Sequence, residues 1–96
     1  MDRKTNVALR ASIPFISPPN CLLITKGVMS LGPEAVWEIL MRVKNFNDFN
    51  ESNDPYGEHD FGSFEYKGRK IFWKIDDLQG EEGFGLVLTV MLAEEY

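Results

Sequence analysis

The sequence has one cysteine and one histidine among its 96 residues. One cysteine excludes an internal disulfide and a zinc site built from several cysteines, and Cys21 is expected to be a small buried hydrophobe. The apolar runs are a handful of residues long, far short of the roughly 20 that cross a bilayer. The first residues, MDRKTNVALR, lack the apolar core of a secretory signal. We therefore expect a cytoplasmic protein that makes no membrane contact.

Basic residues are also few: ten against fifteen acidic residues give a formal net charge of −5 and a pI near 4.8. Such a molecule as a whole repels phosphate backbones, so direct nucleic-acid binding is not expected. No long linker rich in serine, glycine or proline divides the chain, and its 44% hydrophobic and 26% charged residues are typical of a folded domain. The sequence therefore predicts a single domain over residues 1–96.

The first third of the chain predicts one short helix and one strand. The helix is expected over Lys4–Ser12. Val7, Ala8 and Ala11 fall at helical spacing and would form its apolar face. Prolines then open a loop. The stretch CLLITKGVM is rich in Leu, Ile, Thr and Val, so Cys21–Met29 is expected to be a strand.

The strongest helix signal lies over Pro33–Lys44. Proline suits the first helical position, and Glu34 is favoured at the positive end of the helix dipole. Apolar residues then recur at intervals of three and four. We expect this helix to pack on one face of a sheet, with Trp37 in the core.

The stretch FGSFEYKGRKIFWKIDD predicts a hairpin that turns at Lys67–Gly68, where glycine takes a positive φ without strain. In that register Gly62 faces Trp73 and leaves room for the indole. Trp73 and Ile75 then belong to the core face. The last segment, Leu86–Leu92, is apolar on both faces, which is typical of a central strand, although a short buried helix has the same composition.

Together these elements predict an α+β fold: an antiparallel sheet of three to four strands, with one main helix packed on one face and a short N-terminal helix.

The run NDPYGEHDFG, residues 53–62, holds the only histidine. If its strand extends back to His59, the histidine lies opposite Asp76, and consecutive side chains alternate between faces. Glu58, His59 and Asp60 then cannot converge on one metal or substrate. Two interpretations stay open. The run is a structural turn, or it is a rigid acidic turn that presents Tyr56 and the histidine to a partner.

An enzyme is the alternative from a different class. Zinc catalysis usually takes three protein ligands, so His59 would need carboxylates from Asp54, Asp76 or Asp77. His59 with Asp60 or Asp76 can also form an acid/base pair. No serine or cysteine lies in an activating motif, and the alternation of side chains separates Glu58, His59 and Asp60, so we expect no catalytic residue, no metal and no cofactor. A third alternative is a structural or regulatory homodimer formed through the C-terminal segment at a sheet edge.

Four blocks of the sequence carry a resemblance to a known family. LLITKGVMSLGPEAVWEIL, NDPYGEHDFGSFE, IFWKIDD and VLTVMLAEEY resemble the corresponding blocks of an uncharacterised family of small bacterial proteins, a domain of unknown function found on plasmids, phages and chromosomes of proteobacteria. The resemblance spans about Val7–Tyr96, and the NDPYGEHDFG block is highly specific to the family. Members usually carry a longer segment before the LTVML block, which is shortened here to DLQGEEGFG. The resemblance implies a fold and a mobile-element setting, with no established activity.

Small acidic proteins of mobile elements are often inhibitors that cover a surface of a host defence complex, as anti-CRISPR proteins do. We therefore expect a non-enzymatic, acidic protein-binding module. Its partner would be a protein with a basic surface, such as a CRISPR effector subunit. The acidic stretches, with one aromatic anchor and the histidine, give the predicted contact residues: Asp48, Glu51, Asp54, Tyr56, Glu58, His59, Asp77, Glu81 and Glu82.

Overall fold

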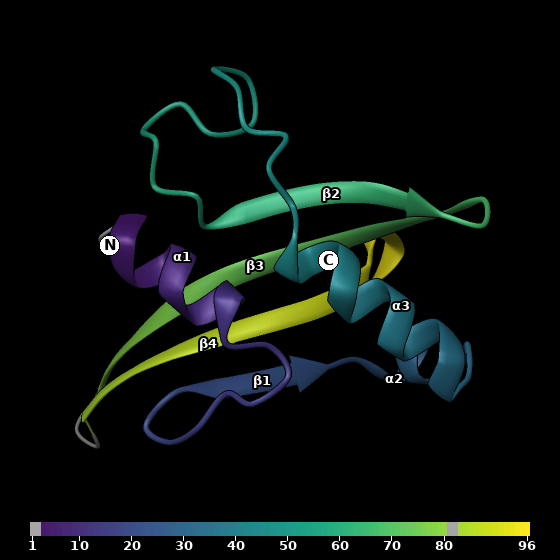
Figure 1. Ribbon diagram of the computed structural model, residues 1–96, viewed down its shortest axis with the longest axis horizontal. Coiled ribbons are helices and arrows are strands. Elements are labelled where there is room, and N and C mark those ends of the chain that lie inside the picture. The colour runs from purple at the N-terminus through teal and green to yellow at the C-terminus, as the bar shows by residue number, and fades with distance from the viewer. Residues whose placement is uncertain (1–2, 81–82) are drawn as a thin grey trace.

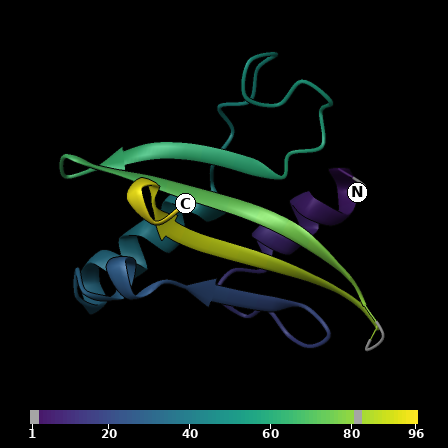
Figure 2. The same cartoon turned by 180° about the vertical axis from the view of Figure 1, so that it is seen from behind.

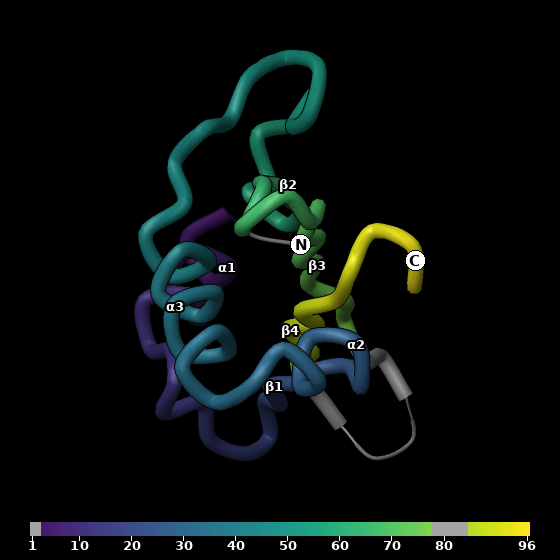
Figure 3. Tube along the Cα trace, turned by 90° about the vertical axis from the view of Figure 1, so that its right-hand side faces the viewer, coloured from purple at the N-terminus to yellow at the C-terminus, as the bar shows by residue number. Residues whose placement is uncertain are grey.

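The computed structural model describes residues 3–80 and 83–96, and it confirms the α+β class. The helices are α1 (Arg3–Ala11), α2 (Lys26–Met29), α3 (Pro33–Lys44) and the 3-10 helix η1 (Ala93–Glu95), and the strands are β1 (Cys21–Ile24), β2 (Phe61–Tyr66), β3 (Arg69–Gly80) and β4 (Gly83–Leu92). The four strands form one sheet, and α1 and α3 lie on the same side of it (Figures 1 and 3). Seen from the other side, the strands lie nearest the viewer (Figure 2). None of the helices in this part of the chain is long and apolar enough to cross a membrane.

The sheet is mixed, with strand order β1-β4-β3-β2. β1 runs parallel to β4, with Cys21 opposite Val87 and Ile24 opposite Val90, so the prediction of a purely antiparallel sheet is wrong. β4 lies between β1 and β3, which confirms the predicted central strand and explains why it is apolar on both faces. The homodimer hypothesis required the C-terminal segment to lie at a sheet edge, but β4 is an inner strand. Cys21 is half-buried rather than buried.

The predicted strand Cys21–Met29 is too long, because β1 ends at Ile24 and α2 follows. Thr25 caps α2: its hydroxyl accepts a hydrogen bond from the N–H of Val28 at 3.5 Å. The same hydroxyl donates to the carboxylate of Glu95 at 2.6 Å, and that carboxylate also accepts the N–H of Gly27 at 3.1 Å. These hydrogen bonds stabilise the turn by which the chain leaves β1, and they connect that turn to η1.

The β2–β3 hairpin has the predicted register. Gly62 lies opposite Trp73, and Lys67 and Gly68 form the turn with φ of 48° and 82°. A Cβ at Gly62 would lie 2.4 Å from Nε1 of Trp73, so glycine is needed here for the indole to fit. Trp73 and Ile75 are buried, as predicted.

Helix α3 has the predicted bounds, but the prediction for Trp37 is wrong. The buried residues of α3 are Ile39, Leu40 and Val43, and they belong to the same core cluster as Trp73. Trp37 lies beside this stripe and is 53% exposed.

The predicted apolar face of α1 is also wrong. Val7, Ala8 and Ala11 are exposed, whereas the helix buries Asn6, Leu9 and Arg10. The buried face of α1 therefore contains two polar residues, Asn6 and Arg10, and is a different face of the helix from the predicted one.

Candidate protein-binding surface

The segment between α3 and β2 projects from the sheet (Figure 1), and we call residues 47–60 the acidic loop. Its side chains hydrogen-bond to its own backbone. The side-chain oxygen of Asn50 accepts the N–H of Ser52 at 2.8 Å and of Asn53 at 3.1 Å. The side-chain amide of Asn53 donates to the carbonyl of Asp48 at 2.7 Å. Such local bonds fix a turn without the ladder of a strand or helix.

Asp54 and His59 join the two ends of the turn. The N–H of His59 donates to both carboxylate oxygens of Asp54, at 3.1 and 3.2 Å, and Nε2 of the ring lies 3.4 Å from Oδ2. Gly57 has a φ of 65°, as the predicted reversal of the chain requires. The Asp54 side chain is only 5% exposed, so this carboxylate is an internal brace of the acidic loop.

The prediction that the strand reaches His59 is wrong. His59 has a φ of 54°, which interrupts an extended strand, and β2 begins at Phe61. The alternation of side chains therefore does not apply to Glu58, His59 and Asp60. Asp60 still lies opposite Ile75, whose N–H donates to the carbonyl of Asp60 at 2.8 Å.

The His59 ring anchors the acidic loop to the core. It stacks on Phe49, with ring centroids 3.8 Å apart and planes 4° apart. Phe49 in turn meets Phe46 and Trp73 edge to face, with ring centroids 5.1 Å and 6.2 Å from its own. The histidine is thus part of an aromatic cluster that continues to the buried indole.

Arg10 supports the same cluster from α1. Its guanidinium donates to the carbonyls of Val43 at 3.0 Å and Phe46 at 2.8 Å, which lie at and just after the end of α3. It also lies 4.9 Å from the ring centroid of Trp73. Arg10 is 5% exposed, and its desolvation lowers the pKa of the guanidinium. These bonds add a charged donor at the C-terminal end of α3, where the Val43 carbonyl also accepts the N–H of Phe46 at 3.3 Å.

Asn6 lies one turn before Arg10 and donates from its side chain to the carbonyl of Glu58 at 2.9 Å. Sequence reasoning missed both polar residues. The available signal was the spacing of Asn6, Leu9, Arg10 and Ile13, which places them on one helical face.

The predicted contact residues fall into four groups. Asp48, Glu51 and Tyr56 are exposed on the acidic loop, with Tyr56 87% exposed. Glu58 and His59 are half-buried, and Asp54 is the internal brace described above. Asp77 is exposed on β3, where it lies opposite Leu86 of β4 and beyond the β3 residues that pair with β2. Glu81 and Glu82 lie outside the described residues.

The acid/base hypothesis paired His59 with Asp60 or Asp76, and the zinc hypothesis added carboxylates from Asp54, Asp76 or Asp77. His59 pairs with Asp54, while Asp76 pairs with Lys74 at 2.9 Å. Burial raises the pKa of Asp60, and the nearby carboxylate of Glu58 raises it further. Across residues 3–80 and 83–96, no three His, Cys, Asp or Glu side chains are grouped so that they can hold a metal ion.

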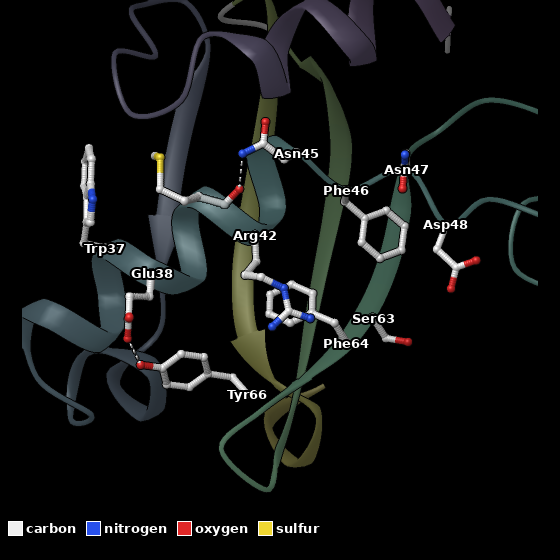
Figure 4. Close-up of a pocket in the computed structure, with 11 residues that line it drawn as sticks. Trp37, Glu38, Arg42, Asn45, Phe46, Asn47, Asp48, Ser63, Phe64 and Tyr66 are labelled. Carbon is white, nitrogen blue, oxygen red and sulfur yellow. Dashed lines mark hydrogen bonds between the residues drawn. The ribbon is translucent and has the colours of Figure 1, made fainter.

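A groove of about 870 Å³ lies between α3 and β2, beside the acidic loop (Figure 4). Arg42 of α3 lies over the ring of Phe64 in β2, 4.4 Å from its centroid. The hydroxyl of Tyr66 donates to the carboxylate of Glu38, and this hydrogen bond raises the pKa of Tyr66. Trp37 also lines the groove. Sequence reasoning missed this groove because it placed the tryptophan in the core.

The fold and surface define a small α+β domain with an internally braced acidic loop and an adjoining groove. The chain belongs to the DUF3768 family, described as a protein of unknown function, whose model matches residues 24–95. The expected membership of an uncharacterised domain family is thus confirmed. The match includes the acidic loop and both walls of the groove, while α1 lies outside it. No curated protein and no solved structure matches the chain.

Proposed function

We propose that this protein is a non-enzymatic binding module that docks on a basic surface of a partner protein through the acidic loop. One observation carries the proposal: the loop turns Asp54 and His59 inward as a brace and leaves Asp48, Glu51 and Tyr56 in solvent.

The brace matters because binding is opposed by the entropy of ordering a loop. A loop whose shape is already fixed by internal hydrogen bonds loses less of that entropy on binding. Tyrosine is frequent among residues that dominate binding energy, because it buries a large area with few rotatable bonds. The carboxylates of Asp48 and Glu51 add attraction to a basic surface and speed the encounter. An exposed aromatic anchor between acids therefore supports a docking role.

In its finer form, the proposal is that the partner belongs to a host defence complex, such as a CRISPR effector subunit, and that this protein inhibits it in the cytoplasm by covering its surface. The support is the net charge of −5, which suits a surface that otherwise binds nucleic acid. The resemblance to proteins carried by mobile elements supports the same setting.

Affinity capture from a host lysate tests the proposal. The wild-type chain is compared with Tyr56→Ala, and with Leu23→Ala as a matched control, because Leu23 is 50% exposed on β1, away from the acidic loop. We expect a basic protein to be retained by the wild type and the control, and to be lost or strongly reduced with Tyr56→Ala. Equal recovery with all three baits contradicts docking through the acidic loop. Recovery of a CRISPR effector subunit supports the finer form, and recovery only of proteins from other processes contradicts it.

A further inference from the structure

We propose that the groove between α3 and β2 binds an extended segment of the partner protein, which adds to the free edge of β2 and carries a lysine or arginine side chain. This proposal rests on the proposed function and names the chemistry that the partner presents.

The free edge is the first observation. β2 is the last strand in the order β1-β4-β3-β2, and within the described parts of the chain it pairs only with β3. The carbonyl of Asp60 points to β3, where it accepts the N–H of Ile75. Backbone groups of an antiparallel strand alternate in direction, so those of Phe61, Ser63 and Glu65 point away from β3. They are the groups that another strand would bond.

Arg42 shows that these outward groups are available for hydrogen bonds. Its Nη1 donates to the carbonyl of Glu65 at 3.3 Å, from the helix across the groove. This side-chain donor occupies the position that the N–H of an added strand would take. The guanidinium also lies over the ring of Phe64. It can keep this contact when the N–H of a bound peptide replaces it at the Glu65 carbonyl.

The walls of the groove suit an extended peptide. A helix beside an open strand edge is the arrangement with which PDZ and PTB domains bind peptides by strand addition. Phe64 and Tyr66 provide apolar surface along β2, and Trp37 stands on the helix side (Figure 4). Trp37 also borders a smaller apolar hollow of about 270 Å³ with Met29 and Pro33. A half-exposed tryptophan between two hollows is a strong anchor for a bound side chain.

The charge of the groove lining favours a peptide with a basic side chain. Glu38 and Asp48 line the groove with carboxylates, whereas Arg42 is its one cationic lining residue. With two carboxylates and one guanidinium, the lining carries a net negative charge. A lysine or arginine on the peptide can pair with these carboxylates, and this preference matches a partner with a basic surface.

Selection from a displayed library of random linear peptides, with the whole chain as bait, supplies the probe. We expect the selected peptides to combine apolar residues with lysine or arginine. We expect binding to slow the hydrogen exchange of the Ser63 amide at least about tenfold, because this N–H faces away from β3 in the free protein. The Phe64 amide, which faces β3, is the internal reference and should change little. Unchanged exchange at Ser63 in the complex, or selection that yields no peptide, overturns the proposal.

Two variants sharpen the test. Trp37→Ala should weaken peptide binding at least about tenfold and leave the chain folded, because Trp37 is 53% exposed. Ser63→Pro removes the outward N–H at an edge position that tolerates proline, and it should abolish binding. Leu23→Ala, on the opposite edge strand, is the control that should bind as the wild type does. Peptide affinity that survives both groove variants overturns strand addition.

The captured partner separates this proposal from the proposed function. If Tyr56→Ala loses the partner while Trp37→Ala and Ser63→Pro keep it, docking through the acidic loop stands and the groove proposal is wrong. If the groove variants also lose the partner, both proposals are supported. Self-association through β2 would be the other use of this edge, so a dimer that Ser63→Pro dissociates would overturn the peptide proposal.

Discussion

The carboxylate of Asp54 holds His59 at two points: both of its oxygens accept the backbone N–H, and Oδ2 lies 3.4 Å from Nε2 of the ring. The ring is fixed in turn by stacking on Phe49. The only histidine is therefore a structural link between the acidic loop and the core.

Replacing Asp54 with alanine should destabilise the fold by about 1–3 kcal/mol, because it leaves a backbone N–H of the turn without its charged acceptor. Asp48→Ala is the control, since Asp48 is exposed on the same loop, and it should change stability by no more than about 0.5 kcal/mol. Denaturant unfolding of both variants gives the two free energies. Equal effects would contradict the brace.

The variant Arg10→Met tests how much the hydrogen bonds from Arg10 of α1 to the end of α3 stabilise the fold. Methionine keeps an unbranched apolar stem, but the carbonyls of Val43 and Phe46 lose the guanidinium that donates to them, so we expect the free energy of unfolding to fall by about 2–4 kcal/mol. Hydrogen exchange should also accelerate at His59, because the aromatic cluster beneath its ring loses the guanidinium. A variant as stable as the wild type would show that desolvation of the guanidinium already cancels its hydrogen bonds.

Gly62→Ala tests the packing of the hairpin. The new methyl group would collide with the Trp73 indole, 2.4 Å from Nε1, and such overpacking costs about 1–3 kcal/mol. Ser63→Ala, at the next position, should be within about 0.5 kcal/mol of the wild type. Thermal unfolding with tryptophan fluorescence as the signal compares the two. Full stability of Gly62→Ala would contradict the close approach of glycine and indole.

The raised pKa of Asp60 predicts that the free energy of unfolding depends on pH. Its pKa is raised, chiefly by burial, so the folded state disfavours the charged carboxylate. That penalty is fully present above the raised pKa and disappears as the pH falls below the ordinary aspartate value. Asp60→Asn should therefore be more stable than the wild type at neutral pH, and the difference should shrink on acidification. Unfolding free energies of Asp60→Asn and the wild type, compared at about pH 7 and about pH 4, measure this difference. A difference that grows on acidification would contradict the direction of the shift.

The hairpin register and the bounds of α3 were predictable because they depend on local signals. The Lys67–Gly68 turn sets the β2–β3 pairs, and Gly32 with Pro33 begins the helix. The parallel pairing of β1 with β4 joins segments that are far apart in the sequence, so no local pattern reveals it.

The errors at the candidate site have a common physical origin. Arg10 is buried because carbonyls from the end of α3 accept its hydrogen bonds, and those partners are distant in the sequence. The spacing of apolar residues on α3 predicts that Trp37 lies in the core, whereas its exposure depends on which part of that apolar stripe meets the sheet. The positive φ of His59 is possible because Asp54 holds its N–H, and a strand pattern gives no sign of it.

The salt dependence of partner affinity tests the central claim most directly. Asp48→Lys with Glu51→Lys reverses two exposed charges on the acidic loop, and Glu34→Lys with Glu94→Lys makes the same change in net charge away from it. Titrations of the captured partner at low and high salt should show that the loop variant binds at least about tenfold more weakly at low salt and has lost most of the salt dependence, while the control binds as the wild type does. Equal affinities and equal salt dependence for the wild type and the loop variant would contradict docking through the acidic loop.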